Sequence, residues 1–199
     1  LSALVSALML TVFQSQLVYF LMHGRLWLII ATFAELALVF VASSMAAKNS
    51  PAALPVFLVY SVLNGFTLSF VVAFYTPGTV LSAFVSSALL FFVMAAIGIF
   101  TKKDLSGMGR ALMAALVGLI IAMVVNLFLA NSFFDYMISI AMVLVFSGLI
   151  AWDNQKIRYV YEQSRGQVAT GWVISMALSI YLDFINLFLS ILRIFGRND

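Results

Sequence analysis

Residues 79–100 read TVLSAFVSSALLFFVMAAIGIF, a long run without a single charged side chain. A helix needs about 20 apolar residues to cross the hydrocarbon core of a bilayer, so this run predicts a membrane-spanning helix. It is continuously apolar, whereas a strand of a membrane β-barrel would alternate apolar and polar residues. The polar segment TKKDLS follows at residues 101–106, and its Asp104 is predicted to cap the next helix.

The composition of the whole chain is also strongly apolar. Apolar residues make up 65% of the 199 residues, charged residues only 9%, and the mean hydropathy is +1.16. A soluble domain carries about 25% charged residues, so this composition excludes a soluble globular domain, a disordered chain and a fibrous protein. The chain has no cysteine, which excludes disulfides, thiol catalysis and thiolate metal sites.

Polar breaks divide the chain into seven apolar runs, which predicts an all-α integral membrane protein with seven transmembrane helices in one domain over residues 1–199. The chain begins with Leu1 rather than Met, so we expect an N-terminal segment to precede it. The sixth helix is predicted to continue to about Glu162, because no Gly or Pro interrupts it. The predicted spans are Leu1–Met22, Leu26–Ala47, Ala52–Tyr75, Thr79–Phe100, Ala111–Ala130, Phe133–Trp152 and Trp172–Ile194.

The basic residues predict the orientation of these spans. Loops on one side of the membrane carry most of them, namely Lys48, Lys102, Lys103, Arg110, Lys156, Arg158 and Arg165. The opposite side carries only Arg25, Arg193 and Arg197. Because cytoplasmic loops are enriched in Lys and Arg, we predict a cytoplasmic N-terminus and a C-terminus outside. In such a protein the basic pI of 9.3 does not indicate nucleic-acid binding.

Three acids fall inside predicted spans, and an ionisable side chain in the hydrocarbon is a candidate functional residue. Asp153 lies about 14 Å from the cytoplasmic end of its helix, and Asp183 lies about 17 Å from the same side. Glu35, in the second helix, lies about 20 Å from Lys48. The two aspartates therefore reach a similar depth on consecutive helices.

Two facing carboxyls in a poorly hydrated site cannot both ionise easily, so they share a proton or hold a cation such as Ca²⁺. This pair predicts a pH-responsive latch with Asp153 and Asp183 as candidate metal ligands. The alternative is that each acid pairs with a base such as Lys156, Arg158 or Arg193, or faces a water-filled vestibule. Glu35 alone is a weaker candidate, since it can bond a Ser or Asn of a neighbouring helix.

Patterns that would indicate an enzyme or a pigment protein do not occur. His23 is the only histidine, and the seventh helix has no lysine for a Schiff base. The second aspartate follows Leu182, which departs from the Gly-x-Gly-Asp motif of intramembrane aspartyl proteases. We therefore predict that the protein is not an enzyme and has no cofactor. Gly65, Ser69, Ser147 and Gly148 are predicted to allow close helix contacts.

Four stretches of the chain resemble the Bax inhibitor-1 family, and the resemblance as a whole covers all seven helices in order. The most specific is the seventh-helix segment MALSIYLDFINLF at residues 176–188, followed by Leu192-Arg193. The others are GFTLS at residues 65–69, KKDLS at 102–106 and DNQKI at 153–157. The chain lacks the long basic C-terminal tail of animal members and is similar to bacterial ones.

This resemblance implies a fold in which six helices surround a central seventh, and a pH-sensitive calcium leak across the bacterial inner membrane. It implies that Asp153 and Asp183 form the proton sensor and that Glu35 lies near the pore. Some bacterial relatives have an arginine cluster that latches one aspartate, and here Lys48 stands in that region. Family members are also associated with regulating a membrane-bound quality-control protease, so a non-conducting regulator that binds another membrane protein is the alternative.

Overall fold

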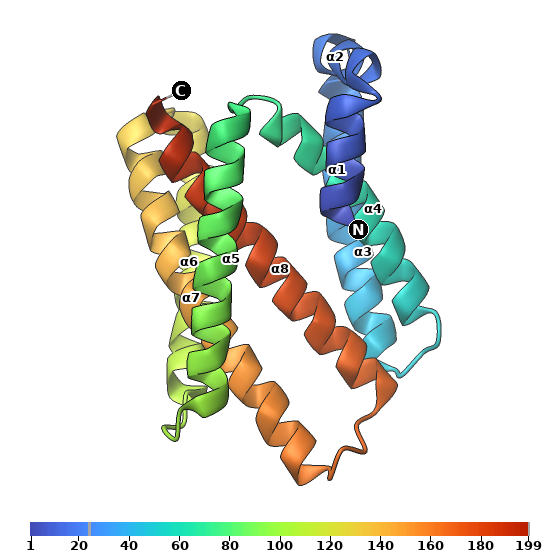
Figure 1. The fold of residues 1–199 in the computed structure, drawn as a ribbon, viewed down its shortest axis with the longest axis vertical. Coiled ribbons are helices and arrows are strands. Elements are labelled where there is room, and N and C mark those ends of the chain that lie inside the picture. The colour runs from blue at the N-terminus through green and yellow to red at the C-terminus, as the bar shows by residue number, and fades with distance from the viewer. Residues whose placement is uncertain (24, 199) are drawn as a thin grey trace. The chain divides into compact units, whose positions relative to one another are not determined.

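The computed structural model describes residues 1–23 and 25–198, apart from the side chains of residues 21, 23, 25–29 and 198. Gly24 in the predicted break after the first span, and the side chain of Arg25, thus lie outside the described residues. Within them every regular element is a helix (Figure 1). The elements are α1 (Ser2–Thr11), α2 (Gln14–His23), α3 (Arg25–Ala47), α4 (Ala53–Val72), α5 (Pro77–Phe100), α6 (Ser106–Leu129), α7 (Ser132–Gln163), α8 (Thr170–Phe195) and the short 3₁₀ helix η1 (Gly196–Asn198).

Six of these helices, α3 to α8, are long and apolar enough to cross a membrane. The predicted first span is not one straight helix, because α1 and α2 meet at a bend of 93°. At this bend the N–H groups of Val12 and Phe13 both donate to the carbonyl of Leu8, which ends α1. The protein is therefore an all-α membrane protein with six spans, or seven if the bent pair crosses as one.

The long helices begin and end where the sequence changes between apolar and polar residues. Pro77 is the first residue of α5, a position where its missing N–H costs no hydrogen bond. The N-cap of α6 is Leu105 and not Asp104 as predicted, although the Asp104 carboxylate accepts the N–H of Ser106 at 2.8 Å; the helix begins before Ala111. Asn131 caps α7 by accepting the N–H of Phe134 at 3.0 Å. The predicted extension of this helix past Trp152 is confirmed, since α7 ends at Gln163.

Contacts divide the chain into two compact units. Unit 1 contains Leu1–Thr76 and Ala169–Leu178, and unit 2 contains Pro77–Val168 and Ser179–Asp199. In unit 1, α1 and α3 both pack on α4, as Figure 1 shows. Gly65 of α4 lies so close to the backbone of Ser2 that a Cβ would approach the Ser2 carbonyl oxygen to 2.5 Å. The predicted close contact at Gly65 is therefore confirmed.

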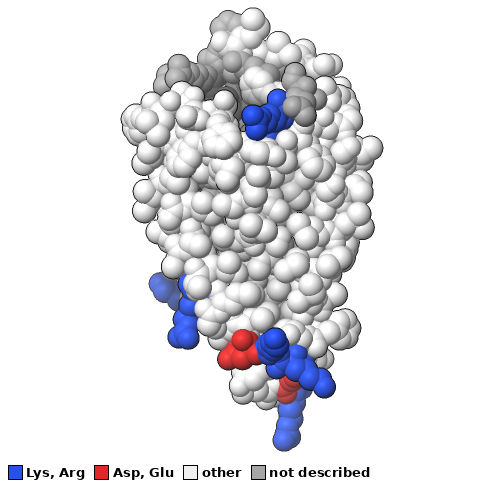
Figure 2. All heavy atoms as spheres, turned by 90° about the vertical axis from the view of Figure 1, so that its left-hand side faces the viewer, with Lys and Arg blue, Asp and Glu red and all other residues white. Residues whose placement is uncertain are grey.

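In unit 2, α7 packs between α5 and α6, while α8 meets α5 through aromatic rings. Phe184 of α8 lies edge-on to Phe84 and Phe91 of α5, with ring centroids 6.0 and 5.6 Å apart. Outside these contacts the helices expose large apolar side chains; Phe128 of α6 is 86% exposed. On the face shown in Figure 2 most of the charged side chains lie near one end and a basic one lies near the other, while the wide middle has none. This is the pattern that a hydrocarbon layer requires.

Candidate functional site

The two aspartates predicted as a pair are both buried in unit 2. Asp153 on α7 is 4% exposed and Asp183 on α8 is 7% exposed. Asp153 lies ten residues before the end of α7 and Asp183 thirteen residues after the start of α8, which places them about 15 and 20 Å along their helices. Both carboxyls therefore lie well inside the spans, where an acid is retained at a cost.

Ser179 is the hydrogen-bond donor to the first of the two acids. Its hydroxyl donates a hydrogen bond to the Asp153 carboxylate. Ser179 and Asp183 are four residues apart on α8, so they share one face of that helix. The Oδ2 atom of Asp183 is buried and has no hydrogen-bond partner among the described atoms. Asp153 thus accepts a hydrogen bond, whereas one carboxyl oxygen of Asp183 accepts none among the described atoms.

Glycines of α5 and α6 hold α7 in place just before Asp153. A Cβ at Gly98 would overlap the backbone of Ala151, and a Cβ at Gly109 would overlap the indole of Trp152. Gly148, one turn earlier on α7, is packed against Leu112 of α6, which confirms the close contact predicted there. Because backbone atoms make the contact at Gly98, α7 cannot move toward α5 without displacing that helix.

Two of the predicted basic partners, Lys156 and Arg193, belong to unit 2 and lie away from the carboxyls. Lys156 places its ammonium over the Trp152 ring, 5.5 Å from the centroid. Arg193 is ten residues beyond Asp183, which is about 15 Å along α8. Lys48 is exposed beyond the end of α3 in unit 1. Within the described residues, no salt bridge to either aspartate is recorded, so the arrangement is that of an acid pair without a paired base.

The acid pair by itself is an incomplete metal site. Across the described residues, no group of three or more His, Cys, Asp or Glu side chains comes together as a metal centre. Ca²⁺ takes about six to eight oxygen ligands, and Asp153, Asp183 and the Ser179 hydroxyl can supply only part of that shell.

Glu35, predicted near a pore, has polar partners in unit 1. The hydroxyl of Thr67 on α4 donates to its Oε1 atom, and the amide of Asn64 lies 3.5 Å from Oε2. Both partners come from α4, and Thr67 belongs to the GFTLS stretch of residues 65–69. The carboxylate of Glu35 is thus held by neutral donors, the alternative that the sequence left open.

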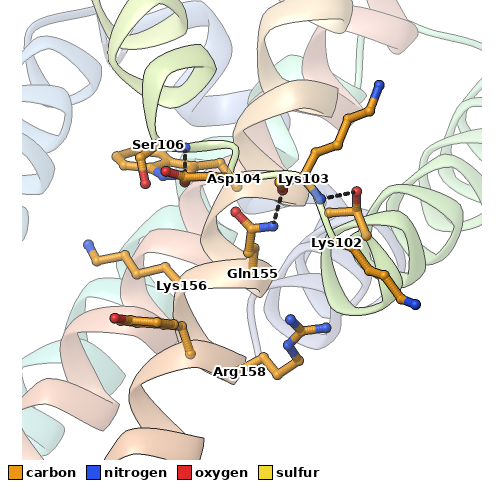
Figure 3. Close-up of a pocket in the computed structure, with 10 residues that line it drawn as sticks. Lys102, Lys103, Asp104, Ser106, Gln155, Lys156 and Arg158 are labelled. Atoms are coloured by element: carbon orange, nitrogen blue, oxygen red, sulfur yellow. Dashed lines mark hydrogen bonds between the residues drawn. The ribbon is translucent and has the colours of Figure 1, made fainter.

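Two features of unit 2 were not predicted as functional. Ser179 was part of a recognised motif, but nothing in the sequence showed that it faces Asp153. A pocket of about 590 Å³ also lies between the α5–α6 turn and α7, lined by Trp152, Gln155 and four basic residues (Figure 3). The hydrogen bonds from Ser106 hold the pKa of the Asp104 carboxyl there below its usual value. In the sequence, the only sign of this pocket was the presence of Lys and Arg residues just before residue 104 and just after residue 155.

These observations define a class: a helical, polytopic membrane protein with a buried pair of aspartates on two consecutive helices. Residues 1–199 match the model of the family described as "Inhibitor of apoptosis-promoting Bax1". The chain belongs to the Bax inhibitor-1 family, and its relatives are bacterial membrane proteins.

The relatives align over nearly all of this chain. An uncharacterized membrane protein of Streptococcus pyogenes serotype M1 is 56% identical over 199 residues, which is 100% of this chain and 87% of the relative. The uncharacterized protein YrjE of Lactococcus lactis is 47% identical over 195 residues, 98% of this chain and 83% of its own length. The inner membrane protein YbhL of Escherichia coli K12 is 41% identical over 181 residues, covering 89% of this chain and 77% of YbhL.

Proposed function

We propose that this protein is a pH-sensitive calcium leak of the bacterial cell membrane, gated by Asp153 and Asp183. The observation that carries the proposal is the burial of both carboxyls in unit 2, where Ser179 donates to Asp153 and neither acid forms a salt bridge among the described residues. A protein that only binds partners has no evident need for two acids in the hydrocarbon, where each is costly.

The gate works through one shared proton. With one proton bound, a hydrogen bond joins the two carboxyls and draws α7 and α8 together, which closes the pathway. When the pH rises the proton leaves, and two like charges a few Å apart repel each other. The repulsion separates the helices unless a cation enters, and a partly hydrated Ca²⁺ relieves it best. Glu35 serves as a further cation contact along the route.

The test is reconstitution of the purified chain into vesicles that contain a calcium-sensitive dye. Calcium entry above that of protein-free vesicles, changing with pH, supports the leak. A folded, reconstituted chain that passes no calcium at any pH would refute it, and would favour the alternative of a non-conducting regulator that binds another membrane protein. In that case affinity capture from bacterial membranes would identify the partner.

A further inference from the structure

The α5–α6 turn and the second half of α7 enclose a pocket that the acid pair does not use (Figure 3). Its volume is about 590 Å³, and it is open on one side. Positive charge dominates its lining, which contains Lys102, Lys103, Lys156 and Arg158 against a single acid, Asp104. The Asp104 carboxylate is occupied by the N–H of Ser106 at 2.8 Å. The pocket therefore carries a net positive charge and favours an anion.

The walls of this pocket are held in position before any ligand arrives. The side-chain amide of Gln155 donates to the carbonyl of Lys103 and accepts the N–H of Leu105, both at 2.8 Å, which fixes the turn to α7. The guanidinium of Arg158 donates to the carbonyl of Ile99 at the end of α5, and its Nε lies 3.6 Å from Glu162. Figure 3 shows Lys102 and Arg158 on the same side of Gln155, with Lys156 on the other.

The position of the pocket indicates which kind of anion it would bind. It lies where α5 ends at Phe100 and α6 begins, at the end of two predicted spans. Beside it Phe100 is 78% exposed and Met108 of α6 is 41% exposed, so an apolar surface adjoins the basic lining. Trp152 and Tyr159 line the pocket as well, and such side chains are typical of the boundary between lipid and water.

From this arrangement we infer that the pocket binds the phosphate headgroup of an acidic phospholipid, with its acyl chains along the exposed end of α5. Basic pockets between transmembrane helices suit lipid phosphates, since each Lys or Arg adds attraction at the membrane surface. A guanidinium held by a backbone carbonyl keeps further N–H groups for phosphate oxygens. This inference does not depend on the calcium leak, because none of the pocket residues belongs to the acid pair.

The experiment is native mass spectrometry of the full chain in a neutral detergent, with phosphatidylglycerol and phosphatidylcholine added in equal amounts. We expect the protein to retain phosphatidylglycerol in preference. The double variant Lys102→Gln/Lys103→Gln should lower this preference by about tenfold or more, because two charges near the phosphate are lost. Both lysines are exposed, so the variant should fold, which its elution profile and melting temperature would check.

A matched control removes two basic residues outside the pocket, Arg165→Gln/Arg197→Gln, and should keep the preference. Equal loss in both double variants would overturn the inference, since only overall charge would then matter. Absence of any preference in the unmodified chain would overturn it too. Displacement of the lipid by millimolar inorganic phosphate would show a site for a free anion and would also refute the lipid assignment. Calcium flux measured in vesicles of pure phosphatidylcholine tests the proposed leak in the absence of acidic lipid. The lipid site and the leak can therefore fail independently.

Discussion

Replacing Asp183 by Asn tests whether the acid pair senses pH. Asparagine has the shape of the protonated aspartic acid and can still hydrogen-bond, but it does not titrate. We predict that Asp183→Asn flattens the pH dependence of calcium flux between about pH 6 and pH 8, the range in which a carboxyl pair that shares a proton should titrate. Asp153→Asn should have the same effect, and the double variant should add little, because both changes break one coupled unit.

The size of the effect depends on the distance between the two carboxyl charges. A charge shifts the ionisation of a neighbouring group when the two lie within about 4–6 Å, so we take about 5 Å for this distance. At an effective dielectric constant of about 20 the repulsion is then about 3 kcal/mol. This corresponds to about a hundredfold change in the equilibrium between closed and open states, which either Asn variant removes.

The assay is calcium entry into dye-loaded vesicles, with equal pH on both sides so that no proton gradient drives the flux. Asp135→Asn is the matched control, because it removes a carboxylate from the first turn of the same helix, α7, away from the pair. Wild type and this control should share one pH profile. If both Asn variants of the pair keep that profile, or if Asp135→Asn also flattens it, the reasoning is wrong.

Three further outcomes are expected. Ser179→Ala removes the donor to Asp153, a bond to a charged group worth about 1.5–3 kcal/mol, and should move the midpoint of the flux profile to higher pH by about one to two units; an unmoved midpoint would contradict this. Gly98→Ala forces a Cβ into the neighbouring backbone and should lower stability by about 1–3 kcal/mol in a thermal melt, whereas Gly118→Ala, with open space around it, should not. Glu35→Gln should slow calcium flux yet keep its pH dependence, and a flattened profile would place sensing outside the aspartate pair.

Much of the fold could be read from the residues in order. Whether a segment spans a membrane depends on its own length and apolarity, since lipid offers no partner for backbone groups and each helix must satisfy them internally. The predicted runs from Leu26 onward therefore correspond to helices α3 to α8. The bend between α1 and α2 was missed because it contains no Gly or Pro and no charged residue interrupts the run there. The two buried aspartates were found for the same local reason: an acid in an apolar run is conspicuous.

What the tertiary structure alone decided is which side chains meet. Asp153 and Ser179 are separated by the whole α7–α8 connection, and Gln155 reaches a turn some fifty residues earlier in the chain. The pattern of apolar and polar residues does not predict these contacts, because they depend on how closely one helix approaches another. Here the distance between helices is set by single glycines that pack against a neighbouring backbone, as Gly98 does against Ala151. The sequence by itself determined the class of protein and its candidate acids, while packing between helices determined the donor for Asp153 and the basic pocket, since both arise from long-range contacts.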